Sequence, residues 1–339
     1  MLRGAIIGCG FFAQNHLHAW GDVDGAELVA VCDLDGEKAA AAAKKFSVPR
    51  HYSDASEMLN EESLEFVDVA TTMPTHRALI ELAAANGVPA ICQKPFAPTI
   101  EDVRAMVEAC RAVNVPLMVH ENFRWQTPLM AVKEVLDSGS VGTPFFGRVS
   151  MRTGFNIYGN QPYLAEEERF IILDLGIHLL DVARFLFGEA KHLACHTASA
   201  NQIVRAEDTA TILLGHKRNV AAFVDCSYFS KTDPDPFPET LVEIDATEGS
   251  IRLLQGYRMT VVTPKGTETR DVSPRLLPWA EKPWHCIQES VLNIQQHWID
   301  CLNDGRETDT SGADNLRTFA LAEAAYESAG SGRTIEITQ

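Results

Sequence analysis

The sequence predicts an α/β protein of two domains: a doubly wound parallel sheet, followed by an open, largely antiparallel β-sheet domain flanked by helices. The first 120 or so residues alternate short apolar runs with helical segments, whereas residues 190–271 consist mainly of strand-like runs. The 339 residues also exceed the roughly 250 to 300 at which a single hydrophobic core stops growing. We place the domains at residues 1–121 and 122–339.

Five apolar runs of the first domain are expected to be its parallel strands. They are residues 3–8, 27–33, 66–72, 88–93 and 116–121. Helical segments lie between them, as parallel strands require. Thr75 and Gly87 mark the start and end of one helix, and Thr99 with Asp102 forms an Asp variant of the capping box before another.

The second domain contains six clear strand patterns and ends in two helices. The strands are residues 208–215, 220–228, 240–246, 250–254, 258–264 and 267–272, and the first two flank the polar turn "HKRN". The Pro-rich piece 233–238 is expected to be a loop. Helices are expected near residues 288–304 and 313–329, with Gly305 and Gly330 as their C-terminal stops.

The charge and composition of the chain indicate which kinds of binding partner are expected. Acidic residues outnumber basic ones by 46 to 29, and the net charge of -17 disfavours binding to nucleic acid and to anionic membranes. No apolar run approaches the roughly 18 residues of a membrane span, and the N-terminal run is too short for a secretory signal. Eight scattered cysteines without a C-x-x-C pair indicate reduced thiols in a cytoplasmic protein. We therefore expect a small-molecule substrate.

A nucleotide-binding turn follows the first strand. "GCGFFA" supplies Gly8, Gly10 and Ala13 in the G-x-G-x-x-G/A pattern of Rossmann domains, in which the backbone approaches a pyrophosphate at a helix N-terminus. The second strand ends in Asp33, whose carboxylate can accept hydrogen bonds from ribose hydroxyls and would repel a 2'-phosphate. The sequence thus predicts NAD rather than NADP.

Ligands of open parallel sheets lie beyond the carboxyl ends of the strands, where the segments "TTMPTH" and "CQKPF" follow the third and fourth runs. The residues that we assign to cofactor binding are Gly8, Gly10, Phe11, Phe12, Asp33, Thr71, Thr72, Pro74, His76, Gln93 and Lys94.

These motifs, with "DLGIH" at 174–178, resemble in order and spacing the Gfo/Idh/MocA oxidoreductases, and residues 305–333 are similar to the closing segment of that family. The resemblance implies a cis peptide bond between Lys94 and Pro95 that aims the lysine across the cofactor. Gln93 departs from the family, because most relatives have glutamate there. The missing carboxylate removes a charge that would favour the ammonium form of Lys94.

Asp174 and His178 are the candidate acid and base. On an α-helix, residues four apart share a face, and Asp181 lies close to it. A dehydrogenase must remove the hydroxyl proton and stabilise the developing alkoxide. We assign the base to His178, the stabiliser or proton relay to Lys94, and an orienting role to Asp174.

Three alternatives compete with this assignment: His178 as a packing residue, Lys94 as a surface lysine, and a metal site. A metal would need a third ligand, and the other histidines lie on distant elements, so we expect no metal. His16 and His18 are interpreted as helix-surface or packing residues.

Polar groups in "HENFRWQ" and "NQPY" are candidate walls of the substrate site, because they follow a strand end or, by resemblance, reach the nicotinamide. The predicted substrate-binding set is Lys94, Asn122, Arg124, Tyr163, Asp174 and His178, with His120 as a further candidate.

The sequence therefore predicts an NAD-dependent dehydrogenase of a small sugar or polyol. "QKPF" and "HENFR" are most similar to a bacterial branch of aldose dehydrogenases that act on sugars such as D-apiose, which implies oxidation of the anomeric hydroxyl to a lactone. Oxidation of an inositol or other polyol to a ketone is the alternative, and a non-catalytic NAD-binding regulator is a third hypothesis. The exposed sheet face predicts a homodimer or homotetramer.

Overall fold

The structure, a computed structural model that describes residues 1–338, builds its first unit around a six-stranded parallel sheet of order β3-β2-β1-β4-β5-β6. The strands are β1 (Leu2–Ile7), β2 (Ala26–Cys32), β3 (Arg50–Tyr52), β4 (Phe66–Val69), β5 (Ala90–Gln93) and β6 (Leu117–His120). The five predicted strands are confirmed. β3 was missed because it has three residues, of which only Tyr52 is buried.

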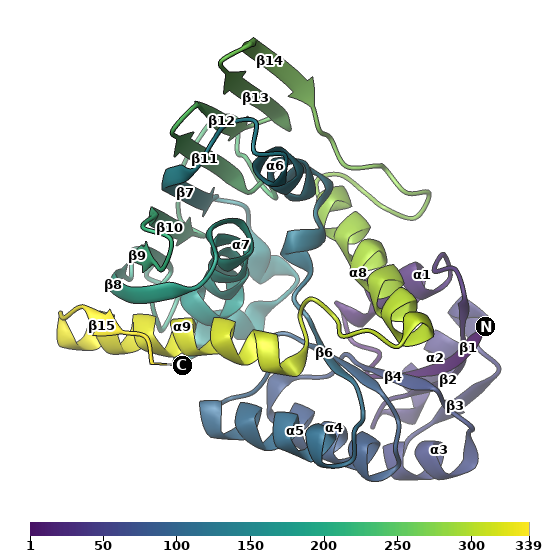
Figure 1. Cartoon of the computed structure of the whole chain (residues 1–339). Coiled ribbons are helices and arrows are strands. Elements are labelled where there is room, and N and C mark those ends of the chain that lie inside the picture. The colour runs from purple at the N-terminus through teal and green to yellow at the C-terminus, as the bar shows by residue number, and fades with distance from the viewer. Residues whose placement is uncertain (339) are drawn as a thin grey trace. The chain divides into compact units, whose positions relative to one another are not determined.

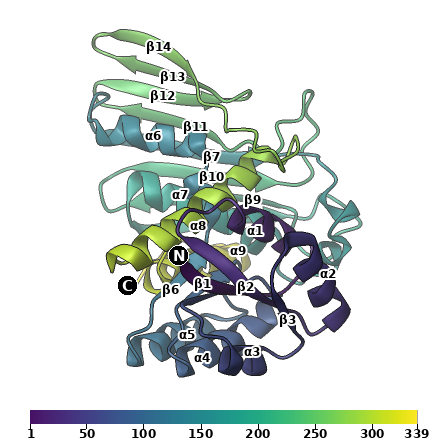
Figure 2. The same ribbon diagram turned by 90° about the vertical axis from the view of Figure 1, so that its right-hand side faces the viewer.

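Helices cover both faces of this sheet, as the predicted doubly wound class requires. They are α1 (Ala13–Trp20), α2 (Gly36–Phe46), α3 (Ala55–Glu61), α4 (His76–Ala85) and α5 (Ile100–Ala112). α3, α4 and α5 lie on one face, and α1 and α2 lie on the other (Figures 1 and 2). Thr99 caps α5 by accepting a hydrogen bond from the Asp102 N–H, at 3.1 Å. Thr75 precedes α4, but its hydroxyl donates to the carbonyl oxygen of Thr72 instead of capping the helix.

The second unit is built on a sheet that, over the described residues, has nine strands in the order β14-β13-β12-β11-β7-β10-β9-β8-β15. The strands are β7 (Pro144–Arg152), β8 (Ala190–Ala198), β9 (Thr209–His216), β10 (Ala221–Ser227), β11 (Leu241–Ala246), β12 (Gly249–Leu254), β13 (Arg258–Thr263), β14 (Gly266–Asp271) and β15 (Ile335–Glu336). Their pairing is antiparallel except between β7 and β10, so the predicted class is confirmed. The central strand β7 was missed, because "PFFGRVSMR" lacks a clean alternation.

Four long helices follow the first sheet in the chain: α6 (Thr127–Asp137), α7 (Ile177–Phe187), α8 (His285–Asp304) and α9 (Gly312–Ser331). α6 and α7 lie against one face of the second sheet (Figure 1). Phe187 of α7 packs directly on Gly147 of β7, where an added Cβ would lie 2.3 Å from the ring. None of the helices within residues 1–338 is long and apolar enough to cross a membrane.

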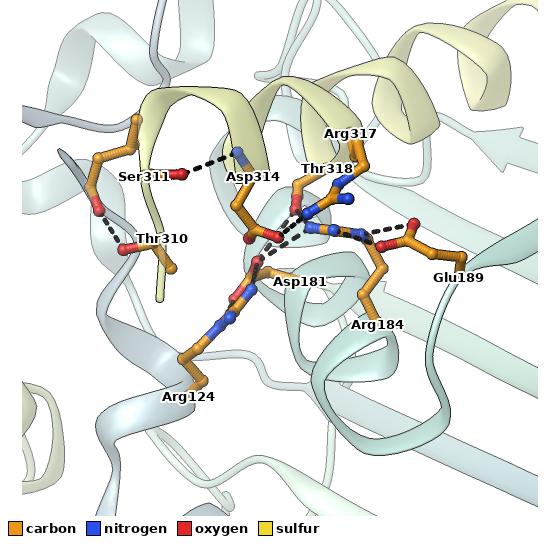
Figure 3. A network of polar contacts seen from close by, with 10 residues as sticks. Arg124, Asp181, Arg184, Glu189, Thr310, Ser311, Asp314, Arg317 and Thr318 are labelled. Carbon is orange, nitrogen blue, oxygen red and sulfur yellow. Dashed lines mark hydrogen bonds and ion pairs between the residues drawn. The ribbon is translucent and has the colours of Figure 1, made fainter. Parts of the chain in front are cut away.

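The division of the C-terminal part of the chain between the two units differs from the expectation. Residues 291–317, which we assigned to the second domain, belong to the first unit together with residues 1–122. The reason is that the Thr310 hydroxyl donates a hydrogen bond to the carbonyl oxygen of Val119 at 2.7 Å (Figure 3). A β-bridge also pairs Ser311 with Met118. The remaining residues, from Phe123 to Ser290 and from Thr318 onward, form the second unit.

The predicted helix stop at Gly330 is wrong. α9 continues to Ser331, and Gly332 takes the left-handed conformation with φ 67°. Its N–H donates to the carbonyl oxygen of Ser328 at 2.8 Å, which closes the last turn. By contrast, Gly305 follows α8 with φ 64°, as predicted.

A buried ion pair connects the turn after β6 to α7 within the second unit. Arg124 and Asp181 are both buried, and the Arg124 Nε donates to Asp181 Oδ2 at 2.6 Å while a terminal nitrogen donates to Oδ1 (Figure 3). Asp181 also accepts a hydrogen bond from the Thr318 hydroxyl at 3.0 Å. Arg184, 3.8 Å from the same carboxylate, is paired with Glu189. The network therefore fixes α7 from several sides.

We expect Gly147→Ala to destabilise the second unit by about 1–3 kcal/mol, because the methyl group must displace the Phe187 ring and with it α7. The matched control is Gly330→Ala, where an added Cβ has no atom within 4 Å and the backbone is helical. That control should gain up to about 1 kcal/mol. Urea denaturation of the three proteins measures both changes, and equal stability of Gly147→Ala and wild type would contradict the packing argument.

Asp181→Asn should cost about 3–5 kcal/mol, because it leaves the buried Arg124 guanidinium without its counter-charge. Arg124→Met should cost less, since Asp181 keeps Thr318 and Arg184. Arg205→Met, which removes the exposed pair with Glu168, is the control and should leave the midpoint of urea unfolding unchanged. A larger loss in Arg124→Met than in Asp181→Asn would refute this ranking.

Candidate functional site

The glycine-rich turn has the geometry of a nucleotide cradle. Gly8 has φ 105°, its N–H donates to the carbonyl oxygen of Cys32 at 2.7 Å, and a Cβ there would lie 2.6 Å from the carbonyl oxygen of Ala70. Only glycine fits such a position. Around Gly10, in contrast, an added Cβ would meet no atom within 4 Å. The backbone after β1 is thus open on the side from which a pyrophosphate would approach.

Asp33 holds this turn from the end of β2. Its Oδ2 accepts a hydrogen bond from the Cys9 N–H at 2.8 Å, and its Oδ1 accepts one from the Asp35 N–H at 2.9 Å. Each carboxylate oxygen has a further lone pair, so the group can still accept from ribose hydroxyls. The residue that we assigned to ribose recognition also fixes the shape of the phosphate-binding turn.

The predicted residues after β4 form a compact segment in the same unit. Thr71 and Thr72 lie at the strand end, Pro74 lies in a short 3-10 helix (Met73–Thr75), and the hydroxyl oxygens of Thr75 and Thr71 are hydrogen-bonded at 2.7 Å. His76 is fully buried, and its ring nitrogens face the carbonyl oxygens of Phe96 and Thr71. Burial lowers the pKa of His76, although the hydrogen bonds to the backbone oppose this effect. The ring links two strand ends, and its contact with the cofactor stays a prediction.

Gln93 and Lys94 follow β5, and the peptide bond between Lys94 and Pro95 is cis, as the resemblance implied. The Gln93 Oε1 accepts a hydrogen bond from the Lys94 N–H at 2.6 Å. Its amide nitrogen lies 2.9 Å from Nε2 of His16. The side chain that replaces the family glutamate therefore contacts the backbone of the candidate catalytic lysine.

His16 is buried rather than on the surface of α1. Its Nδ1 lies 2.7 Å from Asp68 Oδ2, and its ring stacks on His120 with centroids 4.1 Å apart. Sequence reasoning assigned it to surface or packing and missed the polar network. The available signal was Asp68, a carboxylate inside the apolar strand "FVDV", which needs a buried partner.

Asp174 lies in the second unit, in a π-helical segment (Ile172–Gly176) that leads into α7. The expected continuous α-helix is wrong at this point: a π turn inserts an extra residue, so the four-residue register from Asp174 to His178 does not hold across it. Asp174 Oδ2 accepts a hydrogen bond from the buried Tyr228 hydroxyl at 2.9 Å. Burial and the charge of Asp174 raise the pKa of Tyr228 well above its usual value, so the phenol stays a donor. Sequence reasoning missed Tyr228.

His178 lies in the first turn of α7 and is buried. Its ring lies flat on Phe123, with centroids 3.9 Å apart and an interplanar angle of 4°. The stacking fixes the plane in which its nitrogens point. A ring held in one plane is suited to proton transfer in a fixed direction.

The other predicted substrate residues are distributed over both units. Arg124, in the second unit, is engaged by Asp181, which gives it a structural role. Tyr163, 57% exposed, donates its hydroxyl to Gln161 at 2.9 Å in the short helix Pro162–Glu166. Asn122 is buried at the end of the first unit, which also carries Lys94. The substrate-binding roles of these residues stay predictions. Within residues 1–338, no three His, Cys, Asp or Glu side chains are grouped to hold a metal ion.

Comparison with known proteins agrees with this geometry. Residues 2–121 match the family model described as "Oxidoreductase family, NAD-binding Rossmann fold", and residues 129–252 match the "GFO/IDH/MocA C-terminal domain". D-apiose dehydrogenase of Rhizobium rhizogenes is 57% identical over 336 residues, which cover 99% of this chain and 97% of the relative. D-apiose dehydrogenase of Paraburkholderia graminis is 56% identical over 335 residues, covering 99% and 89%.

A solved structure is also similar over its whole length. It is an oxidoreductase from Agrobacterium radiobacter in complex with NAD+, L-tartaric acid and magnesium, with 57% identity, a TM-score of 0.98, and coverage of 99% of this chain and 98% of that one. The family matches and the cradle formed by Gly8, Gly10 and Asp33 identify an NAD-dependent oxidoreductase. The chain therefore belongs to the Gfo/Idh/MocA oxidoreductase family.

Proposed function

We propose that this chain is a D-apiose dehydrogenase, which oxidises the anomeric hydroxyl of the sugar to a lactone. The observation that carries the proposal is the 57% and 56% identity to two proteins of that name over nearly the full chain. When bound in the cradle after β1, NAD would supply the hydride acceptor for the oxidation. In the oxidation to a lactone the anomeric carbon loses a hydride to the nicotinamide and its hydroxyl loses a proton, which the predicted base accepts.

The proton is handled by three side chains in this proposal. His178, whose ring is fixed by Phe123, accepts the hydroxyl proton. Asp174, held by Tyr228, orients the sugar or the histidine. Lys94, whose backbone is fixed by Gln93, donates a hydrogen bond to the oxygen as negative charge develops on it.

The preference for NAD over NADP is assigned to Asp33. Its carboxylate is fixed by two backbone N–H groups at the end of β2, and a 2'-phosphate placed against it would be repelled.

We also infer that the protein works in the cytoplasm as a homodimer or homotetramer, without nucleic acid or membrane. All eight cysteines are free thiols, which suits a reducing compartment. Leu213 of β9 and Phe223 of β10 are paired across the sheet and are 41% and 38% exposed. Such an apolar pair on a broad sheet face favours contact with a second copy.

Lys94→Met should abolish turnover of D-apiose with NAD, lowering kcat/KM by about 10²- to 10⁴-fold, because the developing alkoxide loses its donor. Lys265→Met, in an exposed turn, is the control and should behave as wild type. NADH absorbance follows the reaction with D-apiose, other aldoses and myo-inositol, and NAD binding is measured by quenching of tryptophan fluorescence.

Product analysis separates the hypotheses, because a lactone hydrolyses to an acid and a ketone does not. Oxidation of myo-inositol in preference to D-apiose would favour the polyol alternative, which has support from a 28% identical inositol 2-dehydrogenase of Saccharopolyspora erythraea. Tight NAD binding without turnover of any sugar would contradict the enzyme hypothesis and favour the non-catalytic NAD-binding regulator.

Tyr228→Phe should lower kcat/KM by about 10- to 100-fold, the equivalent of the roughly 1.5–3 kcal/mol of a hydrogen bond to a charged group. The ring is kept, so packing is preserved. Tyr326→Phe removes a similar hydrogen bond, from a partly buried phenol to Glu207, and should affect stability without changing kcat/KM. Equal kinetic effects of the two substitutions would show that Asp174 does not depend on Tyr228.

A further inference from the structure

The Gln93 side chain lies between two groups of the first unit: the backbone N–H of Lys94, which needs an acceptor, and Nε2 of the His16 ring. Its Oε1 is 2.6 Å from the backbone nitrogen of Lys94, and its Nε2 is 2.9 Å from Nε2 of His16. Gln93, His16 and the carboxylate beyond it, Asp68, are all buried. In a buried chain of this kind, each donor must meet an acceptor.

The backbone determines which way the amide faces. The Lys94 N–H can only donate, so the Gln93 oxygen must face it and the amide NH₂ must face His16. Nε2 of His16 is then an acceptor without a proton. The proton of the neutral ring is on Nδ1, which donates to Asp68 Oδ2 at 2.7 Å.

Asp68 reinforces this arrangement, because its Oδ2 also accepts from Trp20 Nε1 at 2.7 Å and from the Gln295 amide at 3.4 Å. The titratable groups packed against the His16 ring are Asp68 on β4 and His120 on β6, which stacks on it. A second proton on His16, at Nε2, would point at the Gln93 NH₂. Two donors would then face each other between buried side chains.

We propose that Gln93 and His16 are positioning residues for Lys94. Gln93 fixes the backbone of the lysine and at the same time holds His16 as the neutral Nδ1–H tautomer. The proposal rests on the proposed function of Lys94, but the state of His16 can be measured without it.

Gln93→Glu provides the sharpest change, because it keeps the shape and the acceptor for Lys94 while replacing the donor to His16 by an acceptor. His16 must then take a second proton to satisfy the new carboxylate. When that proton leaves at higher pH, the lone pairs of His16 and the carboxylate face each other, and the segment that carries Lys94 is pushed away.

The state of His16 is read by solid-state ¹⁵N NMR of protein labelled at histidine, with His16→Gln to identify the signal. In wild type near neutral pH we expect a protonated Nδ1 and a bare Nε2, and in Gln93→Glu we expect two protonated nitrogens. A protonated Nε2 in wild type would overturn the proposal, whatever the activity.

The kinetic test is the pH profile of kcat/KM with D-apiose and NAD. Gln93→Glu should gain a decline on the basic side that wild type lacks, by about tenfold or more. The decline should vanish in the double variant with His16→Gln. Gln296→Glu, on the exposed side of α8, is the control for an added charge and should keep the wild-type profile.

The outcomes separate the two proposals. An unchanged pH profile in Gln93→Glu, with Lys94→Met inactive, would refute the positioning role and leave the lysine catalytic. Full activity of Lys94→Met would refute the catalytic assignment of the lysine and the positioning role that rests on it, whereas the tautomer of His16 would still be decided by the NMR spectrum.

Discussion

Parallel pairing of β1 with β2 and β4, and of β4 with β5, is the constraint on which the cofactor side of the protein depends. It brings the glycine turn, the "TTMPTH" segment and Lys94 to the same edge of one sheet, although about 40 or more residues separate some of them. Two short hydrogen bonds then fix the backbone at this edge. The Cys9 N–H donates to the Asp33 carboxylate, and the Lys94 N–H donates to the Gln93 side-chain oxygen. The motif residues at the separate strand ends come together in one site only because these strands are paired.

The parts of the fold and site that could be predicted are those with a local physical signature. Gly8 is required by its own φ, Asp33 by its place at a strand end, and the five longer strands by runs of buried residues. The family motifs added the cis bond before Pro95. In these cases the information needed is contained within a few neighbouring residues.

What escaped prediction depends on partners distant in the chain. Tyr228 meets Asp174 across 54 positions, and His16 meets Gln93 across 77. The central strand β7 is held by β10 and β11 rather than by its own alternation. The π segment before α7 and the end of α9 beyond Gly330 are decided by packing and by terminal hydrogen bonds, which no residue pattern specifies.

Asp33 has two roles, in the proposed preference for NAD and in the shape of the glycine turn, and this limits how the cofactor preference can change. Its Oδ2 accepts from the Cys9 N–H that shapes the phosphate-binding turn and its Oδ1 accepts from the Asp35 N–H, so a side chain that no longer repels a 2'-phosphate must also supply these two acceptors. An enzyme that changed to NADP would have to replace the acceptors for the backbone N–H groups and also gain a cationic side chain that binds the 2'-phosphate. The side chain that we assign to cofactor preference is therefore also part of the turn, and even Asp33→Asn, which keeps one acceptor oxygen, leaves one of the two backbone N–H groups without its partner.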